Sequence, residues 1–324
     1  AVIGGEIHEI AGVRVLDCGV ESPGSEAAGL GLARAALAGA GEVALLPPGA
    51  VASAWPGCQW PSVRVMSREP VAACLAAQYA GWRIAHDRFF AMTSGPIRAA
   101  IGREELFDTI GLRERPRVAV GILETATLPP VRVCQDLAAA AGVPPDRLIL
   151  LAARTASPAG TLQVVARSLE TALHKLHNAG FDLARVRGGT GIAPLPAVAG
   201  TDLAAIGCTN DAILYGGSVS LDVVGDDPSL AAIGPRGVSG SSPVFGQPFL
   251  SIFEAAGRDF YGVDPGLFAP ARLELVNLDT GVRHAFGCLR PDLVAESFPA
   301  TAAVTTPVTD PGTALGPTPT TGPL

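Results

Sequence analysis

Short apolar runs with the character of β-strands alternate with helix-like runs along most of this 324-residue chain. The strand-like runs VRVLDCGV and RVAVGILET are rich in β-branched residues, whereas residues 26–38 and 131–143 repeat their apolar residues at helical spacing. Gly142 and Gly180 stand where the second of these helices and a longer one over 162–179 would end. The alternation predicts a mixed fold, α/β or α+β, whose core is large enough to need neither a disulfide nor a metal.

Further elements follow from the same patterns. We expect strands in EVALLP, VRVMS and RLILLAA and a helix over 71–83. Near the end, ARLELVNLDTGVRHAFGCL predicts two strands joined across Asp279, Thr280 and Gly281 as a hairpin.

Charge and cysteine usage exclude several classes of protein. The formal charge is −7, with 23 Lys and Arg against 30 Asp and Glu and no basic stripe, so we expect no nucleic-acid partner. No uninterrupted apolar stretch reaches membrane-spanning length and no secretion signal opens the chain, which predicts a cytoplasmic protein without a membrane partner. The six cysteines lack any C-x-x-C spacing and are expected to be reduced and mostly buried.

A metal site is not expected. His174 and His177 stand three apart on a predicted helix, a spacing that could hold a metal, but no thiol or acid lies nearby in sequence. A solvated helix face is the preferred interpretation of this pair.

Arg167 and Glu170 lie three residues apart in LQVVARSLETALHKLHNAG, which would place both on one helix face. Spacing alone favours an ordinary surface ion pair, worth a few tenths of a kcal/mol. The helix is apolar over a wide arc, however, so the pair could be partly buried, and a buried carboxylate beside a guanidinium can be tuned as a general base.

The segment FFAMTSGPIRAA places Ser94 and Gly95 at a turn before a helix, with Arg98 close behind. Such a turn offers backbone N–H groups to an anion, while the alternative is a plain loop that caps a helix. Its spacing fits neither a Walker A motif nor a dinucleotide fingerprint.

Glu124 ends an apolar strand, where ligands of open α/β sheets bind, although a lone acid there is more often merely exposed.

The segment GCTNDAILYGGSV groups Asn210, Asp211 and Tyr215 before the pair Gly216 and Gly217. Two glycines allow a close approach of the backbone to a ligand. Asn210 and Asp211 could equally cap a helix. No G-x-S-x-G elbow is present in the sequence, which removes the commonest serine-hydrolase interpretation.

Taken in order, several unusual strings resemble the methenyltetrahydromethanopterin cyclohydrolases. They are LDCGVESPGSEAAG, ACLAAQYAGWRI, FFAMTSGPIRA, ARTASPAGTLQVVARSLETALHKLH, GCTNDAILYGG and FYGVDPGLFAPARLELVNLDTG. The resemblance covers residues 13–298, and its strings are jointly far more specific than any single short motif.

The resemblance implies an enzyme that opens the methenyl cation of tetrahydromethanopterin with water, reversibly, to the 5-formyl derivative, without a further cofactor. It also implies a homotrimer whose subunit has two α/β lobes with the substrate cleft between them. The family's catalytic Arg and Glu fall on Arg167 and Glu170. The substrate-binding residues that we assign are Ser94, Gly95, Arg98, Glu124, Gln163, Asn210, Asp211, Tyr215, Gly216 and Gly217.

The chain also departs from the family pattern. Thr93 and Ile97 replace smaller residues in the FFAM loop, and an N-terminal helix of the family is expected to be missing. Residues 1–298 would form the catalytic unit, and the Pro- and Thr-rich residues 299–324 a disordered tail. Two alternatives stay open: a paralogue acting on another folate-like cyclic amidine, and a pterin-binding protein without catalysis.

Overall fold

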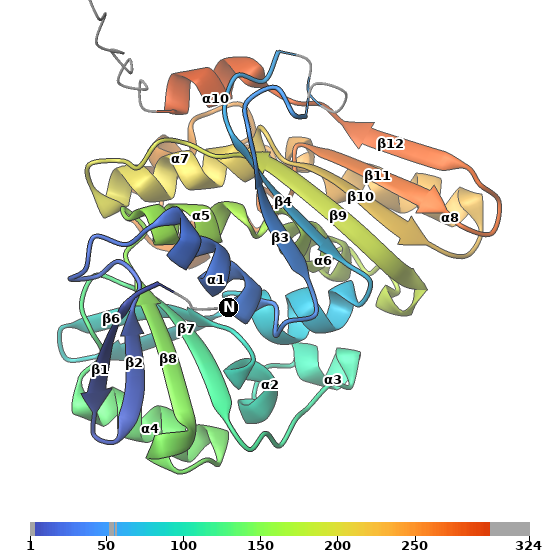
Figure 1. The fold of residues 1–324 in the computed structure, drawn as a ribbon. Coiled ribbons are helices and arrows are strands. Elements are labelled where there is room, and N and C mark those ends of the chain that lie inside the picture. The colour runs from blue at the N-terminus through green and yellow to red at the C-terminus, as the bar shows by residue number, and fades with distance from the viewer. Residues whose placement is uncertain (1–3, 52–54, 56, 299–324) are drawn as a thin grey trace, which may run out of the picture.

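The computed structural model describes residues 4–51, 55 and 57–298, and the predicted tail lies outside these residues. Two six-stranded mixed sheets dominate it (Figure 1), which confirms the mixed α/β fold class. The first sheet has the order β1-β2-β8-β7-β6-β5 and the second β12-β11-β10-β9-β4-β3. The strands are β1 (Glu6–Ile10), β2 (Val13–Asp17), β3 (Glu42–Leu46), β4 (Ser62–Ser67), β5 (Trp82–His86), β6 (Phe89–Ser94), β7 (Ala119–Thr125), β8 (Leu148–Ala153), β9 (Val186–Pro194), β10 (Ser218–Val223), β11 (Arg272–Asn277) and β12 (Arg283–Gly287).

Helices cover both faces of the first sheet and one face of the second, whose strands alternate buried and more exposed residues (Figure 1). The α-helices are α1 (Glu26–Ala36), α2 (Ile97–Ile101), α3 (Leu106–Ile110), α4 (Val131–Ala141), α5 (Pro158–Val165), α6 (Ser168–Asn178), α7 (Asp202–Leu214), α8 (Asp227–Ile233), α9 (Phe249–Ala255) and α10 (Pro291–Ser297). Short 3₁₀ turns are η2 (Pro145–Arg147), η3 (Leu183–Arg185), η4 (Gly234–Gly237), η5 (Ser239–Ser241) and η6 (Phe260–Gly262), and a π-helix is η1 (Val71–Gln78).

The first sheet has an apolar core on each face because its central strands β7 and β8 are mostly apolar. β2, β8 and β7 run parallel, with antiparallel neighbours on either side. Leu148 and Leu150 of β8 pack in the core that α4 covers, while Leu151 points to the opposite face and packs with Leu32 of α1. This alternation is the period-two pattern of a strand with an apolar layer on each side.

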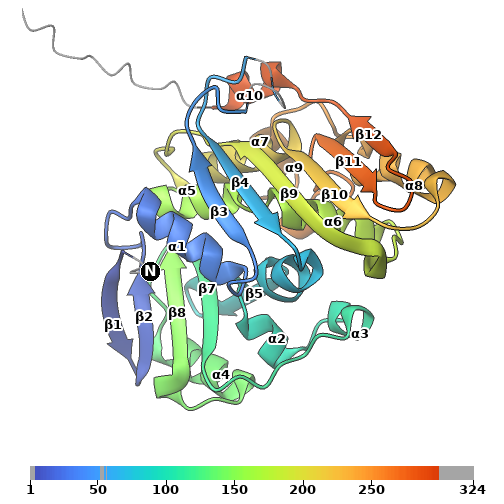
Figure 2. The same ribbon diagram turned by 45° about the vertical axis from the view of Figure 1, so that its right-hand side comes forward.

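Helices α1 and α5 lie between the two sheets, as the two views agree (Figures 1 and 2). They pack closely because Gly29 has no side chain. A Cβ at Gly29 would lie 3.0 Å from Ala159 Cα and from Leu162 Cβ. The helix pair thereby joins the first lobe, which is the sheet β1-β2-β8-β7-β6-β5 with its helices, to the second lobe, which is the sheet β12-β11-β10-β9-β4-β3 with its helices.

Helix α6 lies directly on the second sheet because β9 is rich in glycine. A Cβ at Gly191 would be 2.5 Å from Ser168 Oγ, and one at Gly189 would be 2.7 Å from Leu169 Cδ1. A side chain at either position would push away the first turn of α6. The segment VRGGTG therefore fixes the place of the residues at the start of this helix.

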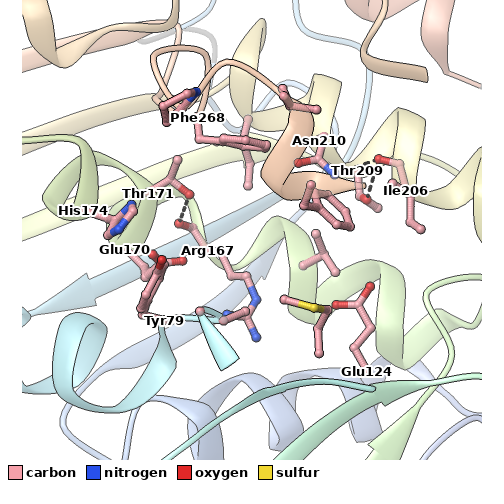
Figure 3. A pocket seen from close by; sticks show the side chains of 18 of the residues that line it. Tyr79, Glu124, Arg167, Glu170, Thr171, His174, Ile206, Thr209, Asn210 and Phe268 are labelled. Carbon is pink, nitrogen blue, oxygen red and sulfur yellow. Dashed lines mark hydrogen bonds between the residues drawn. The ribbon is translucent and has the colours of Figure 1, made fainter. Parts of the chain in front are cut away.

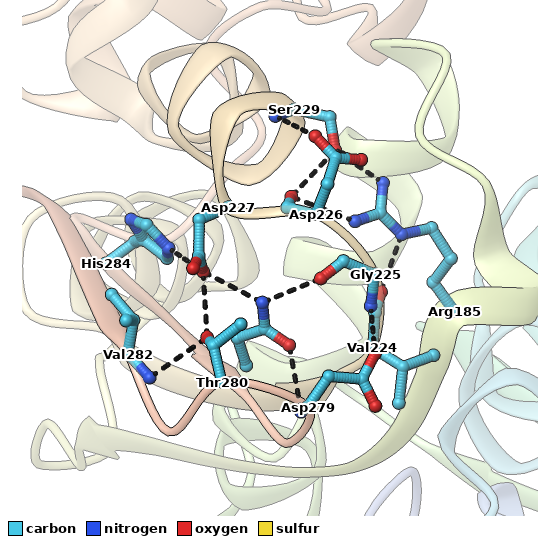
Figure 4. Close-up of polar contacts among 11 residues, drawn as sticks. Arg185, Val224, Gly225, Asp226, Asp227, Ser229, Asp279, Thr280, Val282 and His284 are labelled. Atoms are coloured by element: carbon cyan, nitrogen blue, oxygen red, sulfur yellow. Dashed lines mark hydrogen bonds and ion pairs between the residues drawn. The ribbon is translucent and has the colours of Figure 1, made fainter.

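A polar network ties α8 to the β11–β12 hairpin at the far side of the second lobe (Figure 4). Asp227 Oδ1 accepts hydrogen bonds from Asn277 Nδ2 at 2.8 Å and Thr280 Oγ1 at 3.1 Å, and lies 2.8 Å from His284 Nε2. The predicted hairpin across residues 279–281 is confirmed, and this network holds its turn.

Two predicted helices differ from the structure. The helix expected over 71–83 is the π-helix η1, which ends at Gln78, and its last predicted residues instead begin strand β5. The long helix expected over 162–179 is two helices: Ser157 caps α5, which starts four residues earlier than predicted, and the helix breaks after Val165. The break occurs beside Arg167, whose side chain hydrogen-bonds to Ser94 and Gln163. The other expected strands and the helix that ends at Gly142 are confirmed.

The cysteines are free, as expected, and all but Cys288 are buried. No helix in the described part of the chain is long and apolar enough to span a bilayer.

Candidate active site

A cavity of about 320 Å³ lies between elements of the two lobes. One wall comes from the first lobe, through the segment after η1 and strands β6 and β7. The other comes from α5, α6, α7 and the segment 260–268. The lining residues are Tyr79, Ala80, Gly81, Met92, Glu124, Val164, Arg167, Glu170, Thr171, His174, Ile206, Thr209, Asn210, Ile213, Phe260, Tyr261, Val263, Pro265 and Phe268. The lining is mostly apolar with a few polar groups, as is usual for small-molecule sites.

Arg167 stands at the break between α5 and α6, with φ −94° and ψ 5° as the residue before α6. The prediction that Arg167 and Glu170 share one face of an uninterrupted helix is therefore wrong. Both nevertheless line the cavity (Figure 3). They lie close together because both belong to the first turn of α6, where the Thr171 N–H donates to Arg167 O at 2.9 Å.

The guanidinium of Arg167 is held by neutral acceptors. Nη2 donates to Ser94 Oγ at 2.9 Å and to Gln163 Oε1 at 3.0 Å, and Nη1 donates to the carbonyl of Gln78. Arg167 is 7% exposed. Among the described residues no ion pair joins it to Glu170, so the surface ion pair that spacing alone favoured is excluded on both burial and geometry.

Glu170 is a buried carboxyl that faces the cavity and is 5% exposed. In the described part of the chain no hydrogen bond reaches its carboxyl oxygens. Burial raises its pKa to about 7, and the nearby cations Arg167 and then Arg98 act in the opposite direction. The group can therefore exchange a proton near neutral pH, which is the property of a general base.

Glu124 lies near the end of β7, as predicted, and lines the cavity opposite Glu170 (Figure 3). Its Oε1 accepts from Thr155 Oγ1 at 2.5 Å and its Oε2 from Gln163 Nε2 at 3.3 Å. Gln163 therefore bridges Glu124 and Arg167, and this fixes which end of its amide faces each of them. Gln163 itself is not part of the lining.

The polar groups of the turn before α2 bond to other residues of the protein. Gly95 has φ +95°, and its N–H donates to Ala77 O at 2.8 Å. Ser94 accepts from Arg167, and Arg98 is 1% exposed and paired with Glu104. None of Ser94, Gly95 and Arg98 lines the cavity, so substrate binding by them stays a prediction without a contact to support it.

The segment predicted around Asn210 divides in two. Asn210 lines the cavity, whereas Asp211, Tyr215, Gly216 and Gly217 do not. The alternative that the first two residues cap a helix is wrong, because both lie inside α7.

Four residues of this segment have partners within the protein. Asp211 accepts from Phe249 N at 2.9 Å and from Ser297 Oγ at 2.6 Å. The Tyr215 hydroxyl donates to Gln247 O. The glycines face protein: a Cβ at Gly216 would lie 2.7 Å from Pro194 Cγ, and one at Gly217 would lie 2.5 Å from Ile213 O. Ligand binding by this group stays a prediction, while these contacts explain the residues by packing.

Several lining residues were not anticipated, and His174 is the most informative. Its ring stacks on Tyr79 with 4.2 Å between centroids and 22° between planes. The interpretation of His174 and His177 as a solvated helix face is right only in part, because both are partly buried and Tyr79, in the segment after η1, stacks on His174. Burial lowers its pKa to about 4, so the imidazole is neutral at physiological pH. Its spacing of four from Glu170 was the available signal.

The aromatic lining from segment 260–268 was also missed. Phe260, Tyr261 and Phe268 come from a stretch without regular apolar periodicity. Only the tertiary fold brings this stretch against α6 and α7.

These features define the class of the protein. A buried carboxyl with free oxygens and a pKa near neutrality faces a cavity of small-molecule size beside a buried guanidinium. Such a site belongs to an enzyme that moves protons on a bound small molecule.

Comparison with known proteins gives the family. Residues 5–298 match the model of the cyclohydrolase (MCH) family, and the chain belongs to this family. It is 44% identical over 289 residues to the methenyltetrahydromethanopterin cyclohydrolase of Methylobacterium sp. (strain 4-46), covering 88% of each chain. It is 43% identical over 294 residues to that of Rhodopirellula baltica, covering 89% of this chain and 87% of the relative. It is 37% identical over 290 residues to that of Methanosarcina barkeri, covering 89% of each. The resemblance seen in the sequence is thereby confirmed.

Proposed function

We propose that this chain hydrolyses 5,10-methenyltetrahydromethanopterin reversibly to 5-formyltetrahydromethanopterin. Family membership supports the reaction, and the single observation that carries it in this structure is Glu170, a buried carboxyl open to the cavity with a pKa near 7. The reaction requires one group that accepts and returns a proton near neutral pH.

Each proton transfer of the reaction can be carried by Glu170 in the cavity wall. The methenyl carbon lies between two nitrogens and carries delocalised positive charge, so water can attack it without a metal or another cofactor. Glu170 takes one proton of that water, and its conjugate acid then protonates the nitrogen whose bond to carbon breaks. The second proton of the water leaves as the formyl C=O forms, so that one proton is released per cation hydrolysed.

Arg167 supports Glu170 without touching it directly. Its charge opposes the effect of burial on the pKa of Glu170, so the carboxyl stays within reach of ionisation. Its contacts with Gln78, Ser94 and Gln163 hold the guanidinium still. A carboxylate at this position would also stabilise the cationic substrate electrostatically.

A spectrophotometric assay with methenyltetrahydromethanopterin beside methenyltetrahydrofolate tests the proposal. Turnover of the first substrate, seen as loss of its ultraviolet absorption, with the folate at least tenfold slower, is the expected outcome. Preference for the folate would support the paralogue. Binding of the methanopterin without turnover would support the non-catalytic alternative.

Three further properties belong to the same proposal. We propose a homo-oligomer, a trimer by resemblance to the family, and a cytoplasmic location with a small-molecule pterin as the partner. We also propose that no cofactor is needed, since the substrate is already an electrophile. Sedimentation of the purified protein tests the trimer, and full activity after exhaustive chelation and dialysis tests the last point.

A further inference from the structure

Four side chains stack in a row that leads from the first lobe to the cavity wall. The guanidinium carbon of Arg98 lies 5.3 Å from the ring centroid of Phe107 and 4.9 Å from that of Tyr79. Tyr79 in turn stacks on His174 at 4.2 Å. We call these four residues the stacked row. Its last two members line the cavity and its first two do not.

Arg98 is the charged member of the row, and its charge is buried. Its side chain has no exposed surface, and Nη1 donates to Leu75 O at 2.7 Å. Its other donors form a two-point contact with Glu104, at 3.0 Å from Nε and 2.5 Å from Nη2. Two rings and two polar partners therefore surround one guanidinium. Burying this charge costs desolvation free energy, which an apolar residue at the same position would not incur.

The row ends beside Glu170. His174 follows Glu170 by four residues on α6, so the two share a face, and both line the cavity with Tyr79 (Figure 3). The charged groups that act on the Glu170 carboxyl are the cations Arg167 and Arg98, and the Glu124 side chain faces it across the cavity. The titratable groups around it, Cys74, Tyr79 and His174, are neutral at physiological pH because burial raises the pKa of the thiol and the phenol and lowers that of the imidazole.

We infer that Arg98 is a positioning residue for the reaction proposed above: it clamps the Tyr79–His174 stack against Glu170 and supplies a second buried cation beside that carboxyl. The inference rests on the proposed function, because Glu170 is the group on which Arg98 acts. It replaces the predicted contact between Arg98 and substrate with an indirect role, consistent with a side chain that has no access to the cavity. Glu104 then has the opposite effect on the ionisation of Glu170, because its ion pair with Arg98 partly cancels the positive charge of that residue.

A pair of variants with opposite expected effects tests the inference. In Arg98→Met the loss of the cation should move the acidic limb of the pH profile of kcat/KM upward by about half a pH unit or more. In Glu104→Gln the charge of Arg98 is no longer balanced, and the same limb should move downward. Arg98→Lys keeps the charge and loses the two-point contact, so it should restore most of the limb's position. A merely structural role would lower activity and stability without opposed shifts.

A second readout keeps the inference separate from the proposed function. The protein is labelled with δ-¹³C glutamate, and the Glu170 signal is identified as the one missing from Glu170→Gln. Its titration should shift up in Arg98→Met and down in Glu104→Gln, whether or not the protein turns over the methenyl substrate. If Arg98→Met does not fold, Glu104→Gln and Arg98→Lys decide. If the Glu170 titration moves in neither variant, the inference is overturned. If it shifts as expected in the variants but the wild-type protein does not turn over the methenyl substrate, only the proposed function is overturned.

Discussion

Two carboxyls in this molecule are both buried and both have a raised pKa, but they differ in their hydrogen-bond partners. Glu170 on α6 is 5% exposed and Asp211 on α7 is 1% exposed, and burial raises the pKa of each to about 7. Asp211 accepts hydrogen bonds from the Phe249 N–H and the Ser297 hydroxyl, which joins α7 to α9 and α10. Glu170 has no such donor in the described structure and faces the cavity.

The difference shows that a raised pKa does not by itself identify a catalytic group. A carboxyl whose oxygens are already engaged by protein donors holds elements together, whereas one with free oxygens on a cavity wall can meet water and substrate. We therefore expect substitutions at the two positions to separate activity from stability.

The largest effect is expected from Glu170→Gln. The amide keeps the size of the side chain but cannot take up a proton, so kcat should fall by roughly 10²–10⁴-fold. Substrate binding, measured by fluorescence or calorimetry, should weaken only modestly through the loss of the carboxylate charge, and the thermal midpoint should not fall. Turnover at the wild-type rate would remove Glu170 from the mechanism.

Arg167→Ala should have the next largest effect. It removes a cation that opposes the burial effect on Glu170 and leaves the acceptors at Gln78, Ser94 and Gln163 without their donor. We expect kcat to fall by roughly 10–100-fold and the acidic limb of the pH profile to move upward, since the pKa of Glu170 rises without the charge. Arg167→Lys is the matched control, and an unmoved limb in Arg167→Ala would reduce Arg167 to a structural residue.

Asp211→Ala should destabilise the fold while sparing the chemistry. It leaves the Phe249 N–H and the Ser297 hydroxyl without an acceptor, at a cost of about 1–3 kcal/mol in the free energy of unfolding. Asp211→Asn, whose amide can serve both partners, should cost less. Denaturant unfolding of both variants measures this, and a kcat loss comparable to that of Glu170→Gln would break the distinction between the two carboxyls.

The last expected effect is on the pH dependence of stability. A carboxyl whose pKa rises from 3.8 unfolded to about 7 folded binds more protons in the folded state between these values. Its ionisation therefore lowers the free energy of unfolding progressively as pH rises from about 4 to 7. Asp211→Asn should flatten this decline relative to wild type when thermal midpoints are compared between pH 5 and 8. An unchanged slope would show that Asp211 ionises at its ordinary pKa.

Much of the fold could be predicted because local patterns carry it. The apolar strands, the helix ended by Gly142 and the hairpin at residues 279–281 follow from spacing and turn chemistry. The break after Val165 could not, because residues 162–179 have helical periodicity throughout and only tertiary partners of Arg167 reveal the kink. The π-helix η1 is likewise invisible in an apolar, alanine-rich segment.

Residues of the candidate site could be predicted only where their position in a strand or helix, or next to another charged residue, was visible in the sequence. Glu124 was found because it ends a strand, and Glu170 because it stands near Arg167. Asp211 looked similar to Asn210 in sequence, yet adjacent helical residues point about 100° apart, and only Asn210 reaches the cavity. His174 and the aromatic residues of segment 260–268 depend on contacts between distant parts of the chain.

The pH profile of kcat/KM for hydrolysis of the methenyl substrate decides whether Glu170 is the general base, because its limbs report ionisations of the free enzyme. We expect an acidic limb near pH 7 in the wild-type protein that Asp211→Asn leaves in place, since Glu170 alone of the two carboxyls acts on substrate. A limb near the ordinary glutamate pKa of 4.5, or one that disappears in Asp211→Asn, would contradict it.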